Sequence, residues 1–126
     1  MSRDDTAGLV RRFLDAVNAS DSDTALGCLA EDVAHDLPDG TREIGHEAFR
    51  LFLAGRMRRA DETIADIAIM TDTGGGRAAA EFTRRGRTVA GSAPGQSYSV
   101  TAGLFFEIDD GQITRISDHA GRAPAG

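Results

Sequence analysis

Three side chains stand out as groups that could exchange a proton with a bound molecule: His35, Asp36 and Asp118. The first two lie in the stretch EDVAHDLPDG, where Val33 begins a strand-like pattern and a turn follows at 38–40. An imidazole and a carboxylate on a pocket wall are common means of general acid–base catalysis. Because side chains alternate along a strand, only one of His35 and Asp36 can face a pocket, and we expect it to be His35.

Asp118 lies near the end of the last strand-like stretch, QITRISDHA. If Ile116 faces the interior, the two-residue repeat of a strand puts Asp118 and Ala120 on the same side. A carboxylate on an interior face is costly unless it is paired or lies in a cavity. The alternative is that the strand ends after Ile116 and Asp118 is solvated. Strand geometry alone leaves both open.

The sequence gives little support to other kinds of site. His35, His46 and His119 lie far apart, and no pair has the spacing of metal ligands on a helix, so we expect no metal. The three glycines at 74–76 are followed by neither a lysine nor a helix start, which indicates a hairpin turn and not a phosphate-binding loop. Cys28 is expected to be a buried structural thiol.

Length and composition describe one globular domain, which we place at residues 1–120, with a disordered tail at 121–126. The net charge of −6 argues against a nucleic-acid partner. All 14 basic residues are arginine, which excludes a lysine Schiff base. We find no signal peptide, no run near the ~18 apolar residues of a membrane span, and a single cysteine. We therefore expect a cytoplasmic protein that does not contact membranes.

Periodicity predicts three helices followed by a sheet. Apolar residues repeat at helical spacing over residues 9–17 and 49–57, and a short helix is expected between them at 22–30. A short strand at 31–37 precedes the third helix. Four longer strands are expected at 62–71, 77–89, 97–108 and 112–120, with a bulge or bend near Gly86. Helices segregated from antiparallel strands indicate an α+β fold.

The chain resembles the SnoaL-like, ketosteroid isomerase-related proteins, which share a superfamily with polyketide cyclases and nuclear transport factor 2. The segments that carry the resemblance are LAEDVAHDLPDGTREIGHEAFRLFL, RAAAEF and GQSYSVTAGLFFEIDDGQITRI, and together they cover about residues 5–118. The resemblance implies a cone-shaped, curved mixed sheet wrapped around N-terminal helices, with a pocket for a small apolar molecule at its open end. The residues expected to line this pocket are Phe13, Val17, Leu37, Phe52, Thr101, Gly103, Phe105 and Ile116.

The resemblance also implies roles for the proton-exchanging groups. Polyketide cyclases of this superfamily use a pocket carboxylate to remove a proton next to a carbonyl. Asp118 would be that base, with its pKa raised by apolar surroundings, and His35 would donate a hydrogen bond to the developing enolate oxygen.

The ketosteroid isomerase site, by contrast, carries over poorly. Its helix tyrosine falls at Phe13, its protonated aspartic acid at Gly103, and its general base at Leu37 or, with a shift of one residue, at Asp36. Two of the three groups are therefore missing.

We therefore expect a cofactor-free isomerase or cyclase acting on a small apolar, polyketide- or steroid-like substrate. The alternative is a non-catalytic ligand-binding or dimerisation module, because fold does not fix function. A narrower option is epoxide hydrolysis, which in limonene epoxide hydrolase relatives needs an Asp–Arg–Asp arrangement; Asp118 with Arg84 or Arg115 would supply two members. The strand at 97–108 is apolar on both faces, which predicts a homodimer through the outer face of the sheet.

Overall fold

The computed structural model describes residues 2–89 and 95–119, so the tail expected at 121–126 lies outside the described residues. The three predicted helices are present, and the sheet contains one more strand than predicted. In chain order the elements are α1 (Arg3–Asn18), α2 (Ser22–Gly27), β1 (Leu29–Asp36), β2 (Arg42–Ile44), α3 (His46–Arg59), β3 (Ala60–Thr71), β4 (Arg77–Thr88), β5 (Ser97–Asp109) and β6 (Gln112–Asp118).

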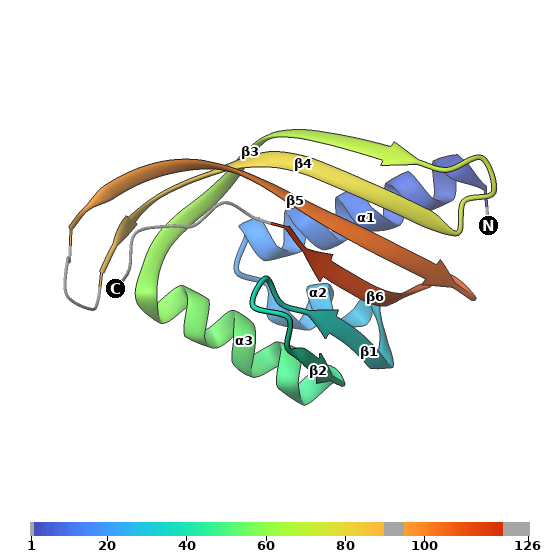
Figure 1. Cartoon of the computed structure of the whole chain (residues 1–126), viewed down its shortest axis with the longest axis horizontal. Coiled ribbons are helices and arrows are strands. Elements are labelled where there is room, and N and C mark those ends of the chain that lie inside the picture. The colour runs from blue at the N-terminus through green and yellow to red at the C-terminus, as the bar shows by residue number, and fades with distance from the viewer. Residues whose placement is uncertain (1, 90–94, 120–126) are drawn as a thin grey trace.

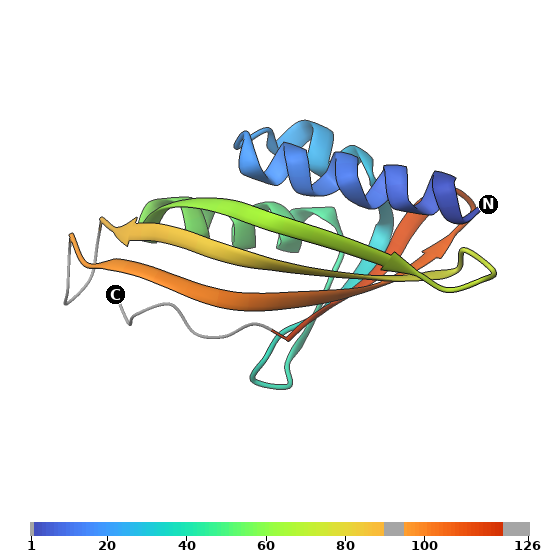
Figure 2. The same cartoon turned by 90° about the horizontal axis from the view of Figure 1, so that it is seen from above.

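The six strands form one sheet in the order β2-β1-β6-β5-β4-β3. β1 runs parallel to β6, and every other neighbouring pair is antiparallel. This mixed sheet confirms the predicted α+β class. Figure 1 shows that the long strands β3, β4 and β5 are strongly bent, and Figure 2 shows the helices together on one side of the sheet. We call the side that carries the helices the inner face and the opposite side the outer face.

The first helix supplies the centre of the core. Ser2 caps it in a capping box with Asp5. Its apolar stripe is buried as predicted, with Phe13 2% and Leu14 0% exposed. Burying side chains of this size stabilises a fold by roughly 1.5–3 kcal/mol each. None of the helices in the described part of the chain is long and apolar enough to cross a membrane.

The end of α1 fixes the bend in β3. The side-chain amide of Asn18 donates from Nδ2 to the carbonyl oxygen of Ile64 at 2.9 Å, and its Oδ1 accepts the Ile64 N–H at 2.8 Å. Just beyond this contact the β3–β4 register shifts between Ala65 and Ala68, and Asp66 has a positive φ of 55°. The predicted bulge is therefore in β3, and not at Gly86.

Gly86 instead leaves space for the side chain of Tyr98. It pairs with Glu62 on one side and with Tyr98 on the other, without a register shift. A Cβ atom here would lie 2.6 Å from the Asp61 carbonyl oxygen and 2.8 Å from the Tyr98 hydroxyl. The missing side chain lets the Tyr98 ring cross β4, so that its hydroxyl donates a hydrogen bond to Glu62.

Candidate functional site

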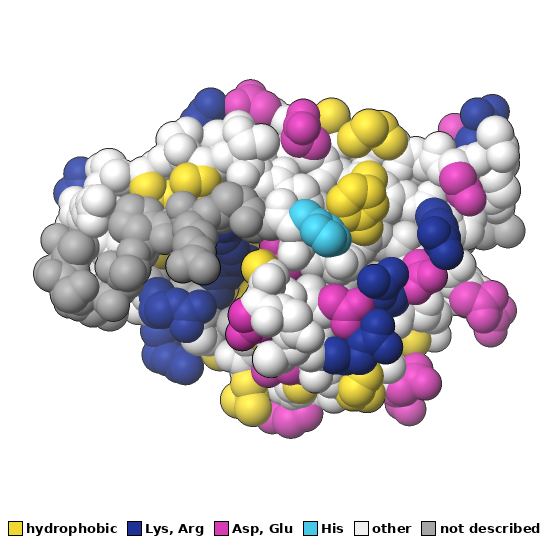
Figure 3. Space-filling view, in the orientation of Figure 1, with side chains coloured by type: hydrophobic (Ala, Val, Ile, Leu, Met, Phe, Trp, Pro, Cys, Tyr) yellow, Lys and Arg dark blue, Asp and Glu magenta, His cyan; other side chains and the backbone are white. Residues whose placement is uncertain are grey.

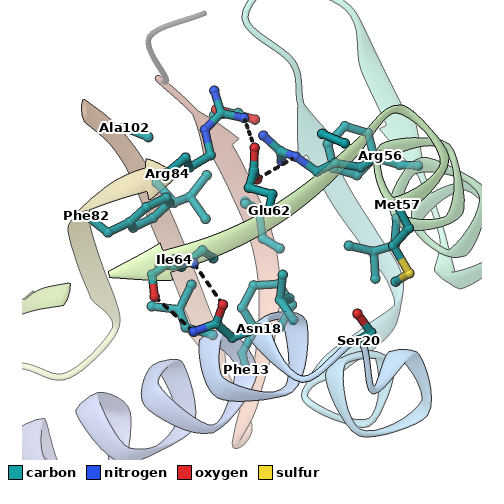
Figure 4. A pocket seen from close by; sticks show the side chains of 18 of the residues that line it. Phe13, Asn18, Ser20, Arg56, Met57, Glu62, Ile64, Phe82, Arg84 and Ala102 are labelled. Carbon is teal, nitrogen blue, oxygen red and sulfur yellow. Dashed lines mark hydrogen bonds and ion pairs between the residues drawn. The ribbon is translucent and has the colours of Figure 1, made fainter. Parts of the chain in front are cut away.

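A cavity of about 350 Å³ lies between the inner face of the sheet and helices α1 and α3. This volume is at the small end of the ~300–1,000 Å³ typical of ligand pockets. Most of the wall is apolar, and Figure 4 shows several of its polar members. The lining residues are Phe13, Leu14, Val17, Asn18, Ser20, His35, Phe49, Phe52, Leu53, Arg56, Met57, Ala60, Asp61, Glu62, Ile64, Phe82, Arg84, Val89, Ala102, Leu104, Ile116 and Asp118.

His35 faces this cavity, as predicted from its strand. Val33 and His35 of β1 are 1% and 3% exposed, whereas their neighbours in the strand are more exposed. The imidazole centre lies 5.0 Å from the Phe49 ring and 4.6 Å from the Phe52 ring. Its Nδ1 is buried and has no hydrogen-bond partner among the described residues.

The charge state of His35 follows from this burial. Burial lowers the pKa of the imidazole, and the negative charge of Asp118 opposes that shift only in part. The ring is therefore neutral near pH 7. A neutral imidazole carries one N–H donor and one acceptor nitrogen, so it can both donate to and accept from a ligand.

Asp118 faces the same cavity. β6 continues to Asp118, and the His119 N–H still bonds to the Gly103 carbonyl at 2.8 Å, so the strand does not end after Ile116. The parallel β1–β6 register pairs His35 with Ile116, which puts Asp118 two residues further along on the same face.

Asp118 is 7% exposed, and its Oδ1 is buried without a hydrogen-bond partner among the described residues. No direct hydrogen bond joins it to His35. Two polar groups that share an apolar cavity without partners are costly to bury. This arrangement is expected where a ligand supplies the missing bonds.

Asp36 does not enter the pocket, which corrects the expectation that it could replace His35 there. It faces outward, where Oδ1 accepts from Arg42 Nε at 2.5 Å and Oδ2 accepts from Arg115 Nε at 2.7 Å. These two guanidinium groups hold the pKa of Asp36 far below its usual range. Leu37 is also outside the cavity: its N–H bonds to the Thr41 carbonyl in the turn that follows β1.

The inward-facing side of β5 is the opposite of the one predicted. Thr101 and Phe105 are exposed on the outer face with Gly103 between them, whereas Ala102 and Leu104 line the cavity. The register decides this, because Ala102 pairs with inward-facing Phe82 of β4. Neither Ala102 nor Leu104 can donate a hydrogen bond from its side chain, so the donor of ketosteroid isomerase expected at Gly103 is missing on either assignment. The other expected lining residues, Phe13, Val17, Phe52 and Ile116, do line the cavity.

The open end of the cavity holds a charged cluster that the sequence did not reveal. Solvent-exposed lining residues mark this end, among them Met57 and Val89. Arg56 Nε lies 3.4 Å from Glu62 Oε1, and Arg84 Nη1 lies 4.0 Å from Glu62 Oε2. Figure 4 shows the two arginines approaching Glu62 from opposite sides. We call Arg56, Glu62, Arg84 and Tyr98 the mouth cluster.

One member of this cluster, Arg84, could be predicted from the sequence. In the stretch RAAAEFTRRG, Arg84 lies two residues after Phe82, so a strand with Phe82 inward must also turn Arg84 inward. Contacts between Arg56, Glu62 and Tyr98 depend on three separate elements and leave no such pattern. Among the described residues, no three His, Cys, Asp or Glu side chains are grouped as metal ligands.

Comparisons with known proteins agree with this architecture. The SnoaL-like domain family model matches residues 10–116. Among solved structures, a "putative polyketide cyclase" from Xanthomonas campestris pv. campestris is 40% identical, with 92% of this chain and 90% of that chain covered and a TM-score of 0.89. One of the same name from Pseudomonas putida KT2440 is 37% identical, with 96% and 92% covered and a TM-score of 0.88.

A more distant structure shares the fold alone. It is a "putative ketosteroid isomerase" from Kribbella flavida DSM 17836. It is 22% identical, with 98% of this chain and 82% of that chain covered and a TM-score of 0.76. No curated protein matches the chain significantly.

Proposed function

Because the chain belongs to the SnoaL-like domain family, we propose that it is a cofactor-free enzyme that removes a proton next to a carbonyl group of a small, mostly apolar substrate. The observation that carries the proposal is that Asp118 and His35 line one cavity, and that each has a buried polar atom without a hydrogen-bond partner among the described residues. The cyclase names of its relatives at 40% and 37% identity favour cyclisation as the overall reaction.

In this mechanism Asp118 takes the proton from the carbon next to the substrate carbonyl, and the electron pair of that C–H bond forms an enolate. Neutral His35 donates a hydrogen bond to the enolate oxygen. In a cyclase the enolate carbon then attacks a second carbonyl of the same molecule. The resulting alkoxide takes the proton back from the Asp118 carboxyl, so no oxidant, reductant or cofactor is required.

The surrounding rings support this chemistry by excluding water. Phe49 and Phe52 cover the imidazole, and Phe13 packs 6.0 Å from Phe49. Electrostatic interactions are stronger in such a dry site than in water. A positioned general base typically contributes ~10²–10⁴-fold to the rate.

The alternatives are less well supported. Epoxide hydrolysis would use Arg84 between two acids, and Arg84 does line the cavity with Asp118, whereas Arg115 bonds to Asp36 on the outer face. Glu62, another acid that lines the cavity, already accepts a hydrogen bond from Tyr98 and pairs with Arg56. A non-catalytic binding module would use the same cavity without turnover.

Proton exchange separates an enzyme from a binder without knowledge of the natural substrate. We suggest 2-tetralone, an apolar bicyclic ketone, in D₂O, with loss of the α-proton signal followed by NMR. The protein should accelerate exchange above the buffer rate, and Asp118→Asn should remove the acceleration. Exchange at the buffer rate in the presence of saturating protein would support the binding module instead.

Assembly is a second part of the proposal. We propose that the outer face of the sheet pairs with a second copy of the chain. Phe105 is 52% and Met70 53% exposed there, and no helix of the described chain covers this face. Figure 3 looks onto it and shows apolar side chains next to a histidine, with basic and acidic side chains in alternation below.

A further inference from the structure

The mouth cluster brings three donor side chains to one acid. Glu62 accepts a hydrogen bond from Tyr98, faces Arg56 at 3.4 Å and faces Arg84 at 4.0 Å. One negative charge thus stands between two positive charges at the open end of the cavity. Tyr98 remains uncharged, because burial and the Glu62 carboxylate raise the pKa of its hydroxyl.

Arg56 is the member of the cluster that is available to a ligand. Its nearest approach to Glu62 is through Nε, and no hydrogen bond is formed by its two terminal nitrogens with the described residues. Its side chain lines the cavity and is 27% exposed, so a ligand can reach it. The guanidinium lies 5.5 Å from the centre of the Phe52 ring, which limits its orientation.

The Phe52 ring contacts both Arg56 and His35. Phe52 contacts the His35 imidazole at 4.6 Å between ring centres and Arg56 at 5.5 Å. A ligand lying along Phe52 can therefore meet His35 with one end and Arg56 with the other. The Asp118 carboxylate repels an anion from the inner end, so the two ends of the cavity favour opposite kinds of group.

We propose that Arg56 binds a carboxylate of the substrate, so that the substrate is an apolar carbonyl compound with an acid group at its outer end. The two terminal nitrogens of a guanidinium match the two oxygens of a carboxylate. Bound in this way, the substrate presents its carbonyl end to His35 and Asp118. The inference rests on the proposed function and adds the substrate class and its orientation.

A pair of probes that differ in charge tests this directly. 2-Naphthoate and 2-naphthamide have the same ring system, and calorimetry at pH 7.5 gives their dissociation constants. The wild-type protein should bind 2-naphthoate about tenfold or more tightly than 2-naphthamide. Arg56→Gln should weaken 2-naphthoate about tenfold and leave 2-naphthamide unchanged.

Two further variants make the result specific. Arg58→Gln is the matched control, because Arg58 lies on the same helix, is exposed and does not line the cavity. It should leave both constants unchanged. Arg56→Lys retains the charge without the paired nitrogens and should give an intermediate affinity for 2-naphthoate. Thermal melting confirms that each variant is folded.

Equal affinity of the wild-type protein for both probes would overturn the inference, and so would an Arg56→Gln variant that weakens both probes equally. Absence of binding by either probe would also overturn it. The exchange of 2-tetralone, which has no acid group, reports separately on the proposed function. If the wild-type protein exchanges 2-tetralone but shows no preference for 2-naphthoate, the carboxylate partner is rejected and the proposed chemistry stands.

Discussion

Asp36 and Asp118 lie almost side by side in the sheet, yet their surroundings differ completely. The parallel β1–β6 register pairs Asp36 with Ser117, one residue before Asp118. Asp36 faces outward and binds two arginines, Arg42 and Arg115, which hold its pKa far below the usual range. Asp118 faces inward, is 7% exposed and has an Oδ1 without a partner among the described residues.

The difference separates an acid whose hydrogen bonds are made within the protein from an acid that still has bonds to make. A carboxylate whose hydrogen bonds are made within the protein has little capacity left for a ligand, and its low pKa makes it a weak base. A carboxylate buried without partners destabilises the free protein and gains bonds only when a ligand enters. In the proposed function the outer acid therefore serves the fold and the inner acid serves the reaction.

The largest expected effect comes from exchanging each acid for its amide. Asp118→Asn should lower the 2-tetralone exchange rate at least ~10²-fold, because it removes the base, while the fold is retained. Asp36→Asn should leave exchange within about twofold. Its cost should appear in urea unfolding, at roughly 1 kcal/mol for a weakened arginine pair. A large rate loss in Asp36→Asn with full activity in Asp118→Asn would mean that Asp36, and not Asp118, is the base.

A second prediction concerns the outer face as an interface. Phe105→Glu places a charge in the proposed dimer contact and should convert dimers to monomers at micromolar concentration, as seen by light scattering. Leu51→Glu is the matched control: Leu51 is 63% exposed but lies on α3, so the variant should remain dimeric. A monomeric wild-type protein would reject this role for the outer face.

Gly86 and Gly103 differ in how closely neighbouring atoms approach them. Gly86→Ala should destabilise the protein by ~1–3 kcal/mol, because a Cβ atom would lie 2.6 Å from a backbone oxygen and displace Tyr98. Gly103→Ala should change stability by less than about 1 kcal/mol, since its Cβ would lie 3.7 Å from the nearest atom. Chemical unfolding measures both. Equal effects would mean that Tyr98 does not depend on Gly86.

The last prediction is a pH dependence of stability that originates at His35. Burial lowers the pKa of His35 in the folded state, so the unfolded chain takes up a proton more readily once pH falls below the ordinary value of 6.5. Stability should therefore decrease from pH 7.5 to 5.5, by at most about 1.4 kcal/mol per pH unit. Asp118, Glu43 and Asp36 oppose the shift, and Arg56 adds to it.

His35→Phe should remove this part of the dependence, because phenylalanine does not titrate. His119→Gln should retain it, since His119 is exposed. Urea unfolding at the two pH values gives the free energies. An unchanged pH dependence in His35→Phe would show that another group is responsible.

The sequence predicted the face of β1 correctly and that of β5 incorrectly, for a physical reason. In β1, Val33 is apolar, whereas Asp32 and Asp36 on the other side of the strand are charged, so alternation selects the side of His35. In β5 both sides are apolar, and only pairing with β4 and packing against the helices decides that Ala102 faces inward. β2 could not be predicted, because three residues are too short for a pattern.

The same reasoning explains which parts of the site were foreseen. Asp118 and His35 each follow an apolar residue by two positions in a strand. This pattern favoured the inward side for His35, whereas for Asp118 it left open whether the strand continues past Ile116. The mouth cluster joins Arg56 of α3, Glu62 of β3 and Tyr98 of β5, so it exists only once the long strands have bent over the helices. Local patterns carry no information about such a bend.

The most direct test of the central claim is a crystal structure with 2-naphthol bound, because this planar molecule resembles the enol of 2-tetralone. We predict that its ring lies against Phe52 in the cavity and that its oxygen lies within hydrogen-bond distance, about 2.5–3.2 Å, of Asp118 or His35. A ligand in the cavity whose oxygen contacts neither side chain, or one bound only on the outer face, would contradict the roles proposed for Asp118 and His35.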